Sequence, residues 1–283
     1  MSLSHASFEF VRHVLRQRSG HHLDADKSYL VETRLLAVAR RHKFASVEDL
    51  VLRLRARKNE HLLAELVEAM TINETFFFRD GQPFEALRQS ILPELMRRRA
   101  DVRCLNIWSA ACASGQEPYS VAMLCRHYFP ELAGWNLQLI GSDLSTAMLE
   151  RARRGHYSDL EISRGLPAEL QAAYLQKHKD GWQVRDDIRR MVEFCPINLS
   201  GAWPALPPLD LVLLRNVLIY FDVPTRQQIL DRVRKVLQPD GYLLLGGAET
   251  THNLDGRFIP VSFEGVSFFQ LREQHATDQL ARG

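Results

Sequence analysis

The stretch Trp108-Ser-Ala-Ala-Cys-Ala-Ser-Gly-Gln-Glu-Pro118 decides the fold, because it joins a short apolar run to a segment with helical periodicity. The run at 102–108 is typical of a buried strand, and a helix is expected at about 118–128 with proline in its first turn. The small residues between them let the backbone approach a ligand closely. The stretch lacks the Gly-x-Gly-x-x-Gly pattern of dinucleotide-binding enzymes. On spacing alone, a ligand site and a plain tight turn fit it equally well.

Strand and helix patterns alternate through the rest of the chain. This alternation predicts an α/β fold, a Rossmann-like and largely parallel sheet with helices on both faces. The expected strands lie at 137–142, 192–196, 209–214 and 242–245, and the expected helices at 145–154 and 226–237. The sequence Gln238-Pro-Asp-Gly241 is expected to end the last of these helices. The polar tail from about 273 is expected to be frayed or to act as a linker.

Residues 1–72 show only helical patterns, which predicts an all-α unit before the sheet. The first helix is expected to end at Gly20. Asp24 is expected to cap a second helix that runs to about 42, and Ser46 a third that runs to 57. A fourth helix is expected at about 60–70.

Composition and charge restrict the class of protein. The 283 residues are 46% hydrophobic and 25% charged, which is ordinary for globular chains. Residues 1–100 hold 17 Lys and Arg against 13 Asp and Glu, so the front of the molecule is the basic part. The four cysteines form no C-x-x-C pair, which argues against disulfides and zinc. No signal peptide and no membrane-spanning run is evident, so a cytoplasmic protein is expected. A monomer that binds no metal is also expected.

Two further polar groups follow predicted strands. Asp143 ends the second strand, where a carboxylate can accept hydrogen bonds from the ribose hydroxyls of an adenosine cofactor, although it could equally cap the next helix. Arg215, Asn216 and Tyr220 lie in an otherwise apolar stretch directly after the 209–214 strand. Buried polar groups need partners or a cleft, so this cluster indicates either a site or a purely structural network.

Three motifs in order resemble the CheR family, the chemotaxis-receptor glutamate methyltransferases. They are Thr71-Ile-Asn-Glu-Thr-Phe-Phe-Phe-Arg-Asp80, Trp108-Ser-Ala-Ala-Cys-Ala-Ser-Gly-Gln-Glu-Pro-Tyr-Ser120 and Arg215-Asn-Val-Leu-Ile-Tyr-Phe221. The resemblance covers nearly the whole chain, as far as Gly246-Gly-Ala-Glu249. It implies transfer of a methyl group from S-adenosylmethionine to receptor glutamates, with S-adenosylhomocysteine as the product.

The resemblance also assigns residues. Arg79 and Tyr220 are expected to position the reacting groups, with Tyr220 near the transferred methyl. The residues expected to bind or flank the cofactor are Asn73, Thr75, Arg79, Glu117, Asp143, Asn198, Leu199, Arg215 and Asn216.

The family organisation implies two domains, a helical receptor-recognition domain at 1–78 and a methyltransferase domain at 79–283. A small antiparallel β-subdomain is expected at about 172–188, around an Asp180-Gly181 turn. Its turn is shorter than in members that dock a receptor peptide there. Lys27, Arg34 and Arg41 recur every seven residues and are expected to share one helix face that draws in the acidic receptor bundle.

Two alternatives remain open. One is a nucleic-acid methyltransferase, which the absence of a basic stripe interleaved with aromatic residues disfavours. The other is an inactive cofactor-binding regulator that docks on signalling partners. The segment Arg215-Asn-Val-Leu-Ile-Tyr220 differs from the Asp/Asn-Pro-Pro-Tyr/Phe pattern expected of an enzyme that methylates exocyclic amines.

Overall fold

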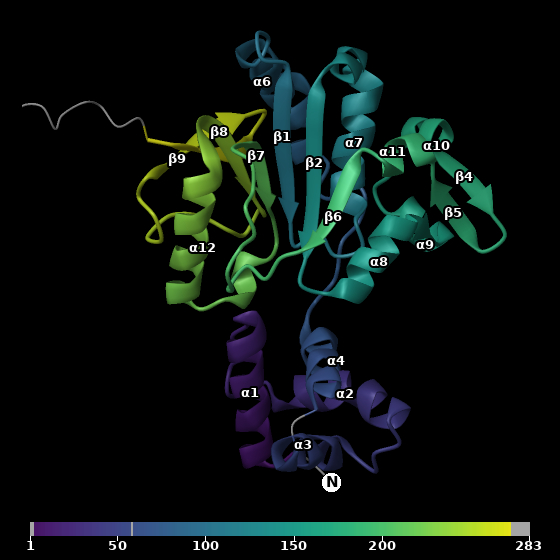
Figure 1. The fold of residues 1–283 in the computed structure, drawn as a ribbon, viewed down its shortest axis with the longest axis vertical. Coiled ribbons are helices and arrows are strands. Elements are labelled where there is room, and N and C mark those ends of the chain that lie inside the picture. Colours follow the sequence, from purple (N-terminus) through teal and green to yellow (C-terminus); the bar gives the residue numbers. More distant parts are fainter. Residues whose placement is uncertain (1–2, 58, 273–283) are drawn as a thin grey trace, which may run out of the picture.

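The computed structural model describes residues 3–57 and 59–272, and it has a helical part joined to a part built on a sheet (Figure 1). The helical part, at the bottom of the view, packs four helices around one apolar core. Side chains of Ser4, Ser46 and Asn59 cap three of the helices. The four helices are α1 His5–Ser19, α2 Ser28–Arg41, α3 Val47–Ala56 and α4 Glu60–Met70.

The helical prediction for this part is confirmed, with one correction. Helix α2 begins at Ser28, not next to Asp24, and its N-cap residue is Lys27. The reason is local, because the Asp24 carbonyl accepts the Lys27 N–H in a turn that comes before the helix. Gly20 ends α1 in the left-handed region, as expected.

The second part contains a seven-stranded sheet in the order β6-β2-β1-β7-β8-β10-β9. Its first five strands are parallel and its last two antiparallel, which confirms the predicted α/β fold. The strands are β1 Cys104–Ala110, β2 Asn136–Asp143, β6 Val192–Pro196, β7 Leu209–Leu214, β8 Leu237–Leu245, β9 Phe258–Phe263 and β10 Val266–Leu271.

Helices cover both faces of this sheet and bury two apolar cores. One face is covered by α7 and the segment before β1, and the other by α12. Short helical turns complete the connections, with a π-helical turn at Leu87–Ile91 and 3-10 turns at Pro130–Gly134 and Leu218–Tyr220. The helices are α5 Gln82–Ala86, α6 Leu92–Arg98, α7 Gln116–Tyr128, α8 Thr146–Arg154, α9 Asp159–Ser163, α10 Ala168–Tyr174, α11 Asp186–Arg189 and α12 Val223–Val236.

Three strand predictions need correction. Strand β1 begins at Cys104 because Val102 is 67% exposed and Arg103 has a φ of 47°, which interrupts extended backbone. Gln238-Pro-Asp-Gly241 lies inside β8, where the register against β7 shifts, so the stop signal marks a bulge within a strand. The β9–β10 hairpin was missing from the prediction.

The expected β-subdomain is present as a three-stranded antiparallel sheet, at the side of the molecule in Figure 1. It contains β4 Leu175–His178, β5 Gly181–Val184 and an additional short strand, β3 His156–Tyr157. Gly181 has a φ of 143°, and a Cβ there would lie 2.3 Å from the Tyr157 carbonyl oxygen. The turn therefore requires glycine.

The described residues contain no helix that is both long and apolar enough to cross a membrane. Within the same residues, no three His, Cys, Asp or Glu side chains gather in a way that could hold a metal ion. All four cysteines are free thiols. The predicted polar tail lies outside the described residues.

Candidate functional site

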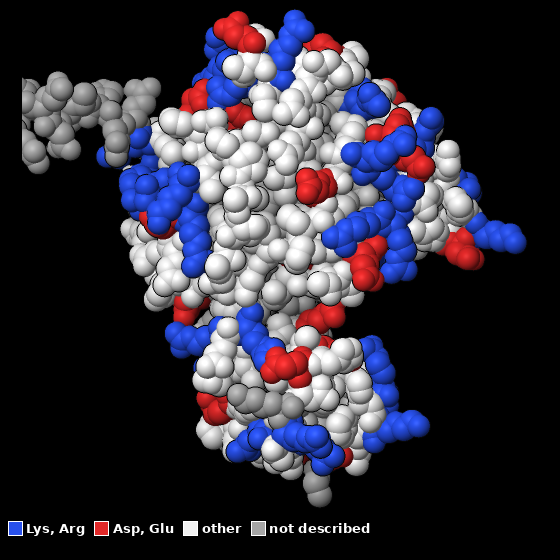
Figure 2. All heavy atoms as spheres, viewed as in Figure 1, with Lys and Arg blue, Asp and Glu red and all other residues white. Residues whose placement is uncertain are grey.

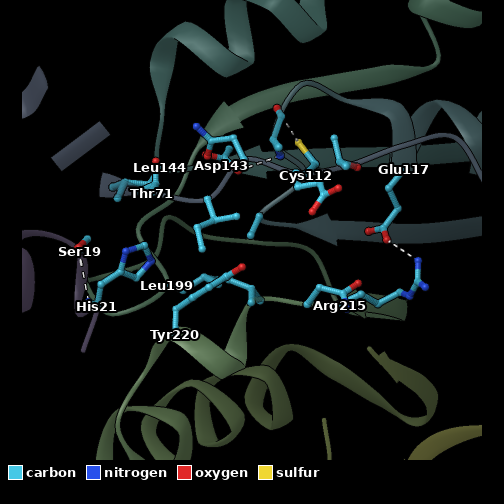
Figure 3. Close-up of a pocket in the computed structure, with 18 of the residues that line it drawn as sticks. Ser19, His21, Thr71, Cys112, Glu117, Asp143, Leu144, Leu199, Arg215 and Tyr220 are labelled. Carbon is cyan, nitrogen blue, oxygen red and sulfur yellow. Dashed lines mark hydrogen bonds and ion pairs between the residues drawn. The ribbon is translucent and has the colours of Figure 1, made fainter. Parts of the chain in front are cut away.

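A pocket lies between the helical part and the carboxyl ends of β1, β2 and β7 (Figure 3). This is the edge where parallel sheets bind ligands. Every site residue predicted from the sequence lines it. The set is Asn73, Thr75, Arg79, Glu117, Asp143, Asn198, Leu199, Arg215, Asn216 and Tyr220.

The loop after β1 forms one wall in a tightly coiled backbone. Ala111, Ala113 and Gly115 all have positive φ, at 53°, 49° and 92°. A Cβ on Gly115 would lie 2.8 Å from the Ala152 side chain, so glycine lets α8 pack against this turn. The turn therefore brings backbone close to the pocket, as the small residues indicated.

Asp143 joins the loop after β1 to the turn after β2. One carboxylate oxygen accepts the Ala113 N–H and the other accepts the Ser145 N–H, both at 2.8 Å. Ser145, not Asp143, caps α8 through its hydroxyl oxygen, which settles the capping alternative. Burial raises the pKa of Asp143, and the backbone N–H bonds oppose that shift. Each oxygen keeps acceptor capacity for a second donor facing the pocket.

Arg215 is bound inside the protein. Its guanidinium donates to a Glu117 carboxylate oxygen at 2.9 Å (Figure 3). It also donates to Asp80 at 2.7 Å and to the Arg79 carbonyl oxygen at 3.1 Å. Ser109 donates to the other Glu117 oxygen at 2.8 Å. These contacts connect β1, α7, the end of β7 and the 79–80 segment. The charges of Arg215 and Glu117 are therefore paired with other groups of the protein.

Asn216 lines the same pocket, and its side-chain oxygen is buried. Its backbone φ is 58°, and its N–H donates to Glu249 at 2.6 Å. Glu249 also accepts the backbone N–H groups of Val217 and Gly246, at 2.9 and 2.8 Å, and so fixes this turn. The buried Asn216 Oδ1 has no hydrogen-bond partner among residues 3–57 and 59–272. A buried acceptor without a partner calls for an explanation, and a ligand donor in the adjoining pocket would supply one.

Asn198 and Leu199 line the pocket from the loop after β6. The Asn198 side-chain amide donates to the Arg18 carbonyl oxygen at 2.8 Å, and its oxygen accepts from Ser200. Asn198 therefore joins this loop to the end of α1. Leu199 contributes an almost fully buried apolar surface.

Arg79 and Tyr220 face the same cavity from the 71–80 segment and from the turn after β7. Arg79 donates to the Glu74 carbonyl oxygen at 3.0 Å and lies over the Phe76 ring at 5.3 Å. Burial raises the pKa of Tyr220, while the positive charges of Arg79 and Arg34 oppose that shift. The phenol is therefore protonated at neutral pH and can donate a hydrogen bond.

Sequence reasoning assigned no role to Ser19 and His21, which line this pocket, or to Glu249, which fixes the turn that carries Asn216. Glu249 lay in the last stretch of the resemblance, and the four backbone N–H groups that it accepts could not be read from the pattern. Ser19 and His21 come from the end of α1 and line the pocket. No motif or spacing in the sequence connected the helical part to the cavity.

Comparisons with known proteins agree along most of the chain. Residues 73–266 match the family model of the CheR methyltransferase, SAM binding domain, and residues 6–71 match that of the CheR methyltransferase, all-alpha domain. The chain is similar to chemotaxis protein methyltransferase 1 of Pseudomonas aeruginosa, at 40% identity over 91% of this chain and 95% of that protein. It is also similar to chemotaxis protein methyltransferase Cher2 of Pseudomonas putida, at 38% identity over 96% of this chain and 100% of that protein.

Proposed function

The chain belongs to the CheR methyltransferase family and takes S-adenosylmethionine as its cofactor, and from this premise we propose that it esterifies glutamate side chains of chemoreceptors. The observation that carries the proposal is one pocket with carboxylates and an unpartnered amide oxygen in its walls and with the cations Arg79 and Arg34 close to Tyr220. Acceptors suit a cationic cofactor, and cations suit an incoming carboxylate.

The residues of the pocket fit the cofactor chemically. S-adenosylmethionine supplies an electrophilic methyl on a sulfonium, together with ribose hydroxyls and an ammonium group. Asp143 retains acceptor capacity for hydroxyls, and Asn216 Oδ1 is a buried acceptor suited to a donor such as an ammonium. Asn73, Thr75, Glu117 and Leu199 complete the proposed cofactor walls.

The proposed methyl transfer needs little general acid–base catalysis from the protein. A glutamate side chain in water has a pKa of about 4.3, so its carboxylate is already ionised at neutral pH. Alignment of the reacting groups can supply roughly 7–11 kcal/mol in favourable cases. We assign Arg79 to holding the substrate carboxylate and Tyr220 to the wall beside the transferred methyl. Both are positioning roles, because an overly tight ion pair would weaken the nucleophile.

The helical part is the proposed receptor-binding unit. Figure 2 shows Lys and Arg side chains around its rim, interspersed with Asp and Glu. Lys27 lies at the N-cap of α2 beside Asp26, and Arg41 ends the helix 3.0 Å from Glu65. Arg34 donates to the Met70 carbonyl oxygen at 2.7 Å. Arg34 is therefore the cation of this set closest to the 71–80 segment.

Charge reversal tests this receptor face. Replacing Lys27, Arg34 and Arg41 with Glu should raise the KM for receptor, because the acidic receptor bundle would then meet like charge. The affinity for S-adenosylhomocysteine should stay unchanged. Loss of cofactor affinity in the same variant would refute a role limited to the receptor.

The chemistry is tested with labelled cofactor and receptor-containing membranes. A carboxyl ester releases labelled methanol in base, so base-labile label on receptors is the expected result. Label that is stable to base would indicate an amine or a nucleic-acid base as the acceptor. Cofactor binding without any transfer would indicate an inactive regulator, and either outcome would overturn the proposal.

A further inference from the structure

One wall of the cofactor pocket comes from the helical part of the molecule. Helix α1 ends at Ser19, and Gly20 turns the chain with a φ of 72°. Ser19 and His21 then line the pocket together with Tyr220 and Phe221. Figure 3 shows His21 beside Tyr220 and Leu199, although these residues come from different parts of the chain.

The backbone fixes this contact. His21 pairs with Phe221 as an isolated antiparallel bridge, and the His22 N–H donates to the Tyr220 carbonyl oxygen at 2.8 Å. A Cβ on Gly20 would lie 2.5 Å from the Ser200 Cβ, so only glycine permits this approach. The end of α1 is therefore held in register with the segment that carries Tyr220.

The His21 ring lies against the same two aromatic residues. Its centroid is 5.6 Å from that of Tyr220 and 5.5 Å from that of Phe221, with tilts of 52° and 55°. Aromatic rings attract one another at such separations when tilted. The ring nitrogens make no hydrogen bond to any residue that the structure describes. The His21 side chain therefore contacts this aromatic pair by ring packing alone.

The His21 ring is also uncharged in the folded protein. Burial, aided by the positive charge of Arg34, lowers the pKa of His21 to about 4. A neutral ring can pack on an aromatic pair and lie near a cationic cofactor without repelling it. A protonated, positively charged ring at the same place would repel the cationic cofactor.

We infer that His21 is a positioning residue for methyl transfer, whose neutral ring, delivered by the helical part, holds the Tyr220 phenol in place at the pocket wall. The inference rests on the proposed function, because it assigns a role within that reaction. It also means that the unit proposed to meet the receptor sets the geometry of the residue beside the transferred methyl.

The test compares His21→Ala, His21→Phe and His21→Leu, with His13→Ala as a control at an exposed position on α1. We measure kcat, the KM for S-adenosylmethionine and the Kd of S-adenosylhomocysteine by calorimetry. His21→Ala should lower kcat between about 10-fold and 100-fold, because misplacement of a positioning group costs rate, while Kd changes less than about threefold. His21→Phe should restore kcat to within about threefold, and His13→Ala should match the wild type.

Several outcomes would overturn the inference. They are an unchanged kcat in His21→Ala, equal kcat in the Phe and Leu variants, or a loss of cofactor affinity as large as the loss of kcat. If His21→Ala does not fold, the Phe and Leu variants decide, since they differ in the ring and not in polarity.

A double-mutant cycle asks whether His21 acts through Tyr220. In a Tyr220→Ala background, His21→Ala should lower kcat by less than about twofold, because its target ring is gone. A further drop as large as in the wild type would refute the link. The wild-type protein separates the two failures. If it labels no receptor, the proposed function fails, whereas labelling that is insensitive to His21 removes only this inference.

Discussion

Replacing Arg215 with Met should destabilise the protein more than it weakens cofactor binding. Arg215 is buried, with 1% of its side chain exposed, and its ion-pair partners differ in burial. Glu117 is 10% exposed and Asp80 is 50% exposed. Removing one member of a buried pair costs about 3–5 kcal/mol, whereas an exposed pair contributes about 0–1 kcal/mol. The loss of unfolding free energy should therefore come almost entirely from the Glu117 side.

Thermal unfolding provides the assay. A loss of about 3–5 kcal/mol corresponds to a fall in Tm of roughly 6–20 °C for a chain of this size. Adding Glu117→Gln should recover part of the loss, because the neutral amide no longer leaves an unpaired buried charge. Asp80→Asn alone should shift Tm by less than about 3 °C. The reasoning would be refuted if Arg215→Met lowered Tm by less than about 3 °C. It would also be refuted if Arg215→Met with Glu117→Gln were less stable than Arg215→Met alone.

Three other perturbations test separate parts of the site. Asp143→Ala should weaken S-adenosylhomocysteine binding by about 1.5–3 kcal/mol, roughly 10-fold to 150-fold in Kd, and an unchanged affinity by calorimetry would remove Asp143 from the site. Gly20→Ala should lower the free energy of unfolding by about 2–5 kcal/mol, because φ is positive at Gly20 and the added Cβ would overlap the loop after β6. In the control Gly134→Ala the Cβ meets open space, so the free energy of unfolding should change by less than about 0.5 kcal/mol. Equal effects of the two substitutions would refute the docking role of Gly20. Because the pKa of His21 is lowered to about 4 in the folded protein, the unfolded chain takes up this proton at a higher pH. The free energy of unfolding should therefore fall by at most about 3 kcal/mol as pH drops from 6.5 to 4, and His21→Phe should lack this contribution. Denaturant titrations that show the same pH dependence of stability in both proteins would contradict the assignment.

Much of the fold could be read from local pattern. The apolar runs at 137–142 and 209–214 became β2 and β7, and helical periodicity predicted the four helices of the front part. The β9–β10 hairpin was missed although Glu264-Gly265 forms its two-residue turn, with φ of 49° and 77°. Its position beside β8 is set by tertiary pairing and not by local pattern. Val102 was assigned to a strand because it is apolar, which the sequence shows directly. The positive φ of Arg103, which interrupts extended backbone there, could not be read from the sequence.

The family resemblance supplied Asn73, Thr75, Arg79, Glu117, Asn198 and Leu199 for the pocket. The sequence by itself placed Asp143, Arg215, Asn216 and Tyr220 at one site, because the carboxyl ends of parallel strands meet at one edge of a sheet. It did not determine what each side chain does there. Only the tertiary structure shows that Arg215 pairs with Glu117, that Asn216 Oδ1 is left without a partner among the described residues, and that His21 packs on Tyr220. These contacts join residues tens to hundreds of positions apart. Local propensity and spacing carry no information about such pairs, since burial and charge pairing are decided when distant segments of the chain pack together.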